Sequence, residues 1–183
     1  MESNDIRGLN YTYNADGYIW KYLGVDKTTA RAASENDQNY IIYRLADVLL
    51  MKAEALIMQG HNEDAADLID RTRERAGLGE TTLSDDRMVM LETLLVERQK
   101  EFFGEGKNWF DLLRIGLRSE QLNDTQYKTL FVEQALKAVG ASRQSLGRAT
   151  LANSGSWYLP YSEDELSKNP LLEQSDYYQS ISN

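Results

Sequence analysis

The chain has 183 residues, a formal net charge of −9 at pH 7 and no cysteine. This length is enough for one domain with a buried core, and the lack of cysteine excludes disulfides, thiol catalysis and cysteine-based zinc sites. The acidic balance argues against nucleic acid as a partner, because phosphate binding needs clustered Lys and Arg. No run approaches the ~20 apolar residues that a membrane-spanning helix requires.

Residues 1–38 predict irregular structure, because no helical period persists among their Asn, Asp, Gly and Tyr. This segment contains the aromatic residues Tyr18 and Trp20. Two roles remain open for such rings. They can stack on the apolar face of a sugar, or they can pack against the ends of a helical array, as half-buried aromatic rings commonly do.

The first helix is predicted over residues 39–59, where apolar residues recur with the 3.6-residue period. It is so apolar that we expect neighbouring structure on both of its sides. Gly60 is placed to end this helix, and Asn62 is a suitable N-cap for a second helix that runs to Ala76. Two helices with so short a link are predicted to form an antiparallel hairpin.

Caps and glycine stops predict three more helices, followed by a tail. The helices run from Ser84 or Asp85 to Phe103, from Asn108 to Gly116, and from Asp124 to Val139. Residues 141–156 are small and polar, which predicts a loop. A capping box at Ser162–Glu165 predicts one or two helical turns within the tail.

These elements together predict a mainly α fold built of tetratricopeptide-like helical hairpins, an α-α superhelix with irregular N- and C-terminal segments. We expect residues 1–183 to form a single domain. Its parts are an irregular segment over 1–38, a helical core over 39–140, and a loop and tail over 141–183.

Several charged residues fall on or beside the apolar side of the third and fourth helices. Arg98 lies inside the apolar arc of the third helix, with Glu101 one turn away and Glu105 as a further candidate partner. Since an unpaired buried guanidinium costs several kcal/mol, Arg98 must be paired. The predicted structural ion network comprises Arg44, Asp47, Arg98, Glu101, Asp111 and Arg114.

The same carboxylates could instead be the acid and base pair of a glycosidase. The structural role is favoured, because neighbouring arginines lower carboxylate pKa values and a general acid needs a raised one. His61 is the one histidine and stands in a predicted turn, so neither a Ser-His-Asp triad nor a histidine metal site can be assembled. We therefore expect no catalytic residue, no metal site and no cofactor.

Several motifs together resemble the C-terminal part of the SusD/RagB family of outer-membrane nutrient-binding lipoproteins. They occur in that family's order, and as a set they are specific. The stretches that carry the resemblance are Tyr43–Ala55, Arg73–Leu78, Glu97–Phe102, Glu105–Arg114, Leu159-Pro160 and Asn169-Pro170.

The resemblance implies a non-enzymatic protein that binds oligosaccharides or polysaccharides at the outer-membrane surface of Bacteroidetes. It also implies a partner, a SusC-type TonB-dependent transporter. Tyr18 and Trp20 are the nearest candidates for glycan contacts on this chain. A helical-repeat module that binds proteins and no sugar is the alternative.

The chain also departs from the family pattern. Family members are considerably longer and begin with a signal peptide and a lipidated cysteine, neither of which is expected on this chain. We therefore expect a C-terminal portion of such a protein. Helix faces that the upstream part covers in longer members are then expected to be exposed.

Overall fold

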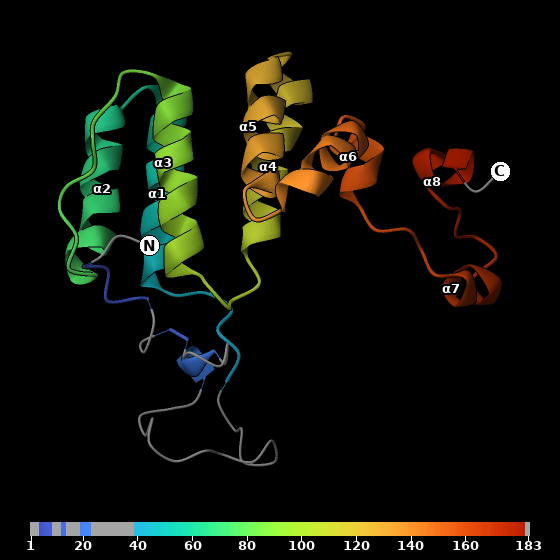
Figure 1. The fold of residues 1–183 in the computed structure, drawn as a ribbon, viewed down its shortest axis with the longest axis horizontal. Helices are drawn as coiled ribbons and strands as arrows, with labels where there is room; N and C mark the ends of the chain where they lie inside the picture. The colour runs from blue at the N-terminus through green and yellow to red at the C-terminus, as the bar shows by residue number, and fades with distance from the viewer. Residues whose placement is uncertain (1–3, 9–11, 14–18, 23–38, 182–183) are drawn as a thin grey trace. The chain divides into compact units, whose positions relative to one another are not determined.

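The computed structural model describes residues 4–8, 12–13, 19–22 and 39–181. Within these ranges the chain is mainly helical, as predicted, and the only strand-like pairing is a single bridge between Tyr13 and Ile19 (Figure 1). The helices are α1 (Leu45–Gln59), α2 (Asn62–Arg75), α3 (Arg87–Glu101), α4 (Asn108–Leu122), α5 (Thr125–Leu136), α6 (Ala141–Leu151), α7 (Glu163–Lys168) and α8 (Asp176–Ile181), with short 3-10 turns η1 (Trp20–Tyr22) and η3 (Ser154–Trp157). None of these helices is both long and apolar enough to cross a bilayer.

Contacts divide the chain into two compact units, Met1–Asp111 and Leu112–Asn183, and the division falls within α4. The single domain expected over residues 1–183 stays a prediction.

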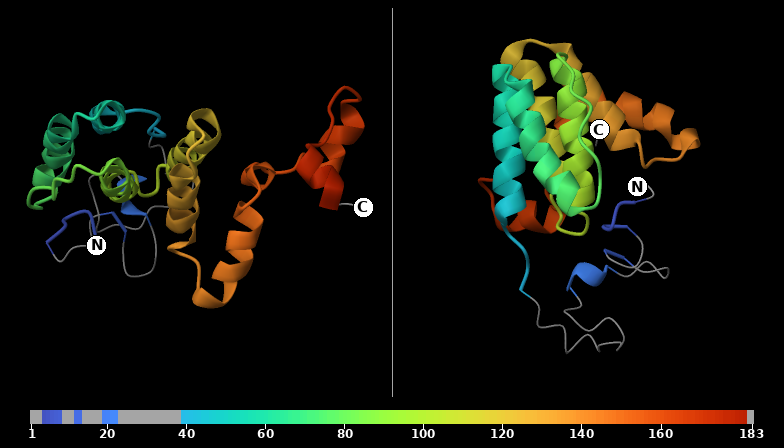
Figure 2. Two further views of the ribbon diagram at one scale, coloured as in Figure 1. Left: turned by 90° about the horizontal axis from the view of Figure 1, so that it is seen from above. Right: turned by 90° about the vertical axis from the view of Figure 1, so that its left-hand side faces the viewer.

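In the N-terminal unit, α1, α2 and α3 pack side by side (Figure 2). The α1–α2 hairpin turns at Gly60, whose φ of 82° is left-handed and so favours glycine. The side chains fully buried among α1, α2 and α3 are Leu50, Ala53, Ile57, Ala65, Ile69, Met90, Leu91 and Leu94.

The first helix begins later than predicted, at Leu45 instead of residue 39. Arg44 has extended backbone angles, and its backbone N–H donates to the Asp47 carboxylate at 3.3 Å. This contact fixes the N-terminus of α1 at Leu45. Ile42 and Tyr43 continue the apolar pattern without being helical, and both are exposed.

The C-terminal unit is organised around Trp157 and Phe131, whose ring centroids lie 4.5 Å apart. Trp157 comes from η3 and donates its indole N–H to the backbone carbonyl of Leu151 at 3.0 Å. Tyr127 and Leu136 of α5 are also buried. Ser162 caps α7, as its side chain accepts a hydrogen bond from the backbone N–H of Glu165, and the short helix begins where the sequence predicted one.

The prediction that the fourth helix ends at Gly116 is wrong, because α4 continues to Leu122. A Cβ atom at Gly116 would lie 3.0 Å from atoms of both Phe131 and Trp157. The glycine therefore allows two aromatic rings to approach the helix backbone, and it does not stop the helix.

The predicted loop over residues 141–156 is also wrong, because it contains α6 and η3. No residue of α6 is buried, so this helix has no apolar stripe for the 3.6-residue period to reveal.

Replacing Gly116 by valine is expected to lower the free energy of unfolding by about 1–3 kcal/mol, the usual cost of overpacking. The added methyl groups would press on the rings of Phe131 and Trp157. Urea unfolding monitored by circular dichroism measures this change. Gly79→Val is the control, because no atom lies within 4 Å of a Cβ there. Equal stabilities of the two variants would contradict the expectation.

Candidate functional site

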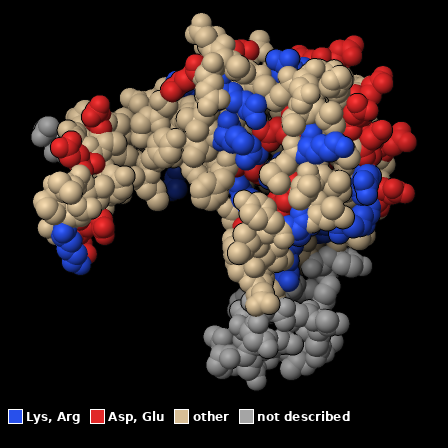
Figure 3. All heavy atoms as spheres, turned by 180° about the vertical axis from the view of Figure 1, so that it is seen from behind, with Lys and Arg blue, Asp and Glu red and all other residues tan. Residues whose placement is uncertain are grey.

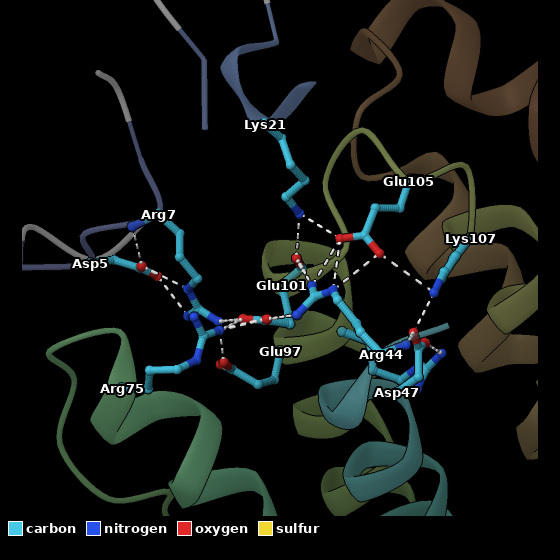
Figure 4. A network of polar contacts seen from close by, with 11 residues as sticks. Asp5, Arg7, Lys21, Arg44, Asp47, Arg75, Glu97, Glu101, Glu105 and Lys107 are labelled. Carbon is cyan, nitrogen blue, oxygen red and sulfur yellow. Dashed lines mark hydrogen bonds and ion pairs between the residues drawn. The ribbon is translucent and has the colours of Figure 1, made fainter. Parts of the chain in front are cut away.

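Three buried carboxylates follow one another at intervals of four residues where α3 ends. Glu97, Glu101 and Glu105 are 1%, 3% and 1% exposed. Spacing of four residues places Glu97 and Glu101 on one side of the helix. Figure 4 shows cations converging on all three from the N-terminal segment, from the residue before α1 and from α2.

Glu101 accepts contacts from three guanidinium groups. Arg75 of α2 lies 2.5 Å and 2.6 Å from its two carboxylate oxygens, and Arg7 lies 3.1 Å away. Arg44, the residue before α1, also donates to it. One carboxylate therefore connects three segments that are far apart in the sequence (Figure 4).

Glu97 and Glu105 extend the network to the N-terminal segment. Arg7 pairs with Glu97 at 2.5 Å and with its near neighbour Asp5 at 2.9 Å. Glu105 forms ion pairs with Lys21 at 2.6 Å and with Arg44 at 2.8 Å. Arg7 and Lys21 thus join the N-terminal segment to Glu97, Glu101 and Glu105 by ion pairs.

Arg98 belongs to the same network on its other side. Its guanidinium makes a two-pronged contact with Asp111, both hydrogen bonds being 2.8 Å long, and lies 3.7 Å from Asp47. Lys107 also pairs with Asp47. The Phe102 ring lies beside three of these cations, because the charged groups of Arg44, Arg98 and Lys107 are 4.7–4.9 Å from its centroid.

The ion pairs of the structure include five residues that the sequence suggested for an ion network. Arg44, Asp47, Arg98, Glu101 and Asp111 all lie in the N-terminal unit. Arg114 lies half-buried on α4 and belongs to the C-terminal unit. Sequence reasoning did not place the following members in the network: Asp5, Arg7, Lys21, Arg73, Arg75, Glu97 and Lys107.

A signal for some of these missed residues exists in the sequence. Glu97 precedes Glu101 by four residues, and that interval is the one on which helical side chains share a face. Glu105 was proposed as a partner of Arg98, but it binds Arg44 and Lys21 instead. Arg7 and Lys21 stand in an irregular segment, where no period indicates the direction of a side chain.

The charges of the network keep the central carboxylates ionised. Burial alone would raise the pKa of Glu101, but Arg44, Arg75 and Arg7 hold it below its ordinary value of 4.5. Burial likewise opposes the effect of Arg44 and Lys21 on Glu105, whose pKa is also lowered. A carboxylate that stays ionised in this way is a poor general acid. The described residues also contain no group of three or more His, Asp or Glu side chains that could hold a metal ion.

Stability is expected to fall as the pH drops below about 4.5, because the lowered pKa values of Glu101 and Glu105 stabilise the folded state only while both are ionised. That contribution to stability is fully present at a pH above the pKa values of the unfolded chain. It is lost as the pH falls through the lower pKa values of the folded state. Urea midpoints measured between about pH 7 and about pH 3 test this. Glu101→Gln is expected to make the urea midpoint depend less steeply on pH. An unchanged dependence would contradict the role of Glu101 in the loss of stability at low pH.

The two glycan candidates are largely outside what the structure describes. Tyr18 lies outside the described residues, and Trp20 begins η1, where only its backbone is described. Lys21, the next residue, ties η1 to the carboxylate of Glu105 and to the carbonyl of Glu101, at 2.6 Å and 2.8 Å. His61 is exposed in the α1–α2 turn and lines a polar pocket of about 350 Å³.

The sequence profile of the SusD family matches residues 3–178. The chain belongs to the SusD family. Among its relatives, SusD-like protein P25 of Formosa agariphila is 29% identical over 171 residues, which cover 92% of this chain and 28% of the relative. SusD-like protein P38 of the same organism is 37% identical over 89 residues, 44% of this chain and 18% of the relative.

Solved SusD structures agree with this assignment. A SusD superfamily protein from Bacteroides fragilis matches 76% of this chain and 28% of its own, with a TM-score of 0.54 and 27% identity. Another from Bacteroides vulgatus matches 76% of this chain and 27% of its own, with a TM-score of 0.52 and 32% identity. The chain therefore spans less than a third of the length of these SusD proteins.

Proposed function

We propose that the chain is a non-catalytic, glycan-binding part of an outer-membrane system for polysaccharide uptake. The observation that carries this proposal is the SusD family match over residues 3–178. The ion network supports it, because Arg and Lys side chains neutralise the buried acids that a glycosidase would need. The chain then captures sugar without cleaving it.

Isothermal titration against a panel of plant and host oligosaccharides tests the proposal. Heat with at least one sugar, and no release of reducing ends from it, is the expected result. No heat with any member of the panel would favour the alternative, a helical module that binds proteins. Release of reducing sugar would point to a glycosidase and contradict the proposal.

The partner in this proposal is a SusC-type TonB-dependent transporter, and the location is the cell surface at the outer membrane. Both follow from what SusD family membership implies. A genomic neighbour encoding such a transporter, and its co-purification with the protein from detergent-solubilised outer membranes, are the expected observations. Fractionation of the natural protein away from the outer membrane would contradict the location.

Trp20→Ala is expected to weaken glycan binding by about twofold to tenfold, because an aromatic contact contributes about 0.5–1.5 kcal/mol. Isothermal titration with the best sugar of the panel measures this change. Trp20→Phe is the matched control, since it keeps a flat ring and should keep most of the affinity. Wild-type affinity in Trp20→Ala would remove this residue from the proposed site.

A further inference from the structure

Lys21 attaches the short turn η1 to the end of α3. Its ammonium group donates to the Glu105 carboxylate at 2.6 Å and to the backbone carbonyl of Glu101 at 2.8 Å (Figure 4). The Lys21 side chain is 19% exposed, and the Glu105 side chain is fully buried. Solvent therefore screens this ion pair less than it screens a pair at the surface.

Two further contacts hold the turn at its ends. Ile19, which precedes η1, lies so close to Gly104 that a Cβ atom added there would be 2.9 Å from its side chain. Tyr22, the last residue of η1, stacks on Tyr40, with ring centroids 6.3 Å apart and ring planes 4° from parallel. A 3-10 turn of three residues gains too little from its own hydrogen bonds to be stable alone. Contacts of this kind therefore fix where its backbone lies.

Trp20 stands between these contacts in the sequence, and the proposed function gives it a contact with glycan. A contact residue that is ordered before the ligand arrives costs less on binding than one that must be ordered at that moment. We propose that Lys21 is a positioning residue for glycan binding, because its ion pair with Glu105 holds the η1 backbone that carries Trp20. This inference rests on the proposed function and adds a residue that acts without touching the sugar.

Lys21→Met tests the proposal, because it removes the ammonium group and keeps most of the side-chain bulk. Glu105 retains Arg44 at 2.8 Å, so the variant leaves no unpaired buried carboxylate and is expected to fold. Isothermal titration with the best sugar of the oligosaccharide panel should show an affinity about twofold to tenfold lower, and no lower than that of Trp20→Ala. Lys21→Arg keeps the charge and should restore most of the affinity.

The double variant Trp20→Ala/Lys21→Met separates positioning from a direct contact with sugar. If Lys21 acts through Trp20, its loss has no further effect once the indole ring is gone. The double variant should then bind sugar as Trp20→Ala alone does. Additive losses of affinity would show that Lys21 acts on the sugar by another route, and they would overturn the proposal.

A fluorine signal from 5-fluorotryptophan at position 20 reports on the turn without any sugar. Trp20→Phe assigns this signal, because it removes one tryptophan of three. The signal is expected to shift in Lys21→Met and to stay near its wild-type position in Lys21→Arg. An unchanged signal in Lys21→Met would overturn the proposal.

The control must reproduce the loss of a positive charge. The chain has a net charge of −9, and acidic side chains gather along the outer edge of the N-terminal unit in the view from behind, beside uncharged surface with scattered Lys and Arg (Figure 3). Lys128→Met removes the same charge from α5 in the C-terminal unit, where Lys128 donates to the backbone carbonyl of Ala152. This variant should bind sugar as the wild type does, and a loss equal to that of Lys21→Met would overturn the proposal.

The titrations also distinguish this inference from the proposed function. No heat from the wild type with any sugar of the panel would overturn both of them. Heat from the wild type, with an unchanged affinity in Lys21→Met, would overturn the positioning role of Lys21 alone.

Discussion

Replacing Arg98 by alanine is expected to lower the free energy of unfolding by about 3–5 kcal/mol, the usual cost of removing one partner of a buried ion pair. The change removes both 2.8 Å hydrogen bonds to Asp111, a residue that is only 4% exposed. It also removes a cation from beside buried Asp47. Urea unfolding followed by circular dichroism measures the loss.

Two further variants separate the network from the general effect of losing an arginine. Arg71→Ala removes an exposed arginine from α2 and should change stability by no more than about 0.5 kcal/mol. Arg98→Lys keeps the charge but loses the two-pronged geometry, so an intermediate loss is expected. An Arg98→Ala protein with the melting temperature of the wild type would show that the ion pair of Arg98 with Asp111 does not stabilise the fold.

Glu101→Gln is expected to cost about 3 kcal/mol or more, because it leaves guanidinium groups near a buried neutral amide. Arg7, Arg44 and Arg75 all donate to the carboxylate that is lost. The amide has nearly the same size, so packing changes little. The urea midpoint of the variant at neutral pH measures the effect.

Glu133→Gln is the matched control for Glu101→Gln. Glu133 pairs with Arg148 at the surface, where both side chains are nearly half exposed. Solvent and salt screen such a pair, so its loss should leave the urea midpoint almost unchanged. Similar shifts of the urea midpoint in the two variants would contradict the central role of Glu101 in the ion network.

The sequence predicted the helices whose inner faces are apolar. Gly60 ended the first helix where expected, and the position of Arg98 within an apolar arc correctly indicated a buried, paired cation. In both cases a local rule and the tertiary contact agree: a left-handed glycine suits a short turn, and a buried charge requires a partner.

The errors occurred where the local signal is weak or points to another cause. The α6 helix buries no residue and so has no periodic pattern. Gly116 is of a residue type that often ends helices. Here it lets the rings of Phe131 and Trp157, which follow later in the chain, approach the backbone of α4. Arg7 and Lys21 could not be assigned partners, because only the folded chain brings them to Glu97 and Glu105.

The separation of those charges along the chain has a consequence for synthesis. Arg7 and Glu97 are 90 residues apart. At a translation rate of about 5–20 residues per second, Arg7 leaves the ribosome roughly 5–20 s before Glu97 does. The ion pairs of Arg7 with Glu97 and Glu101 can therefore form only after the end of α3 has emerged.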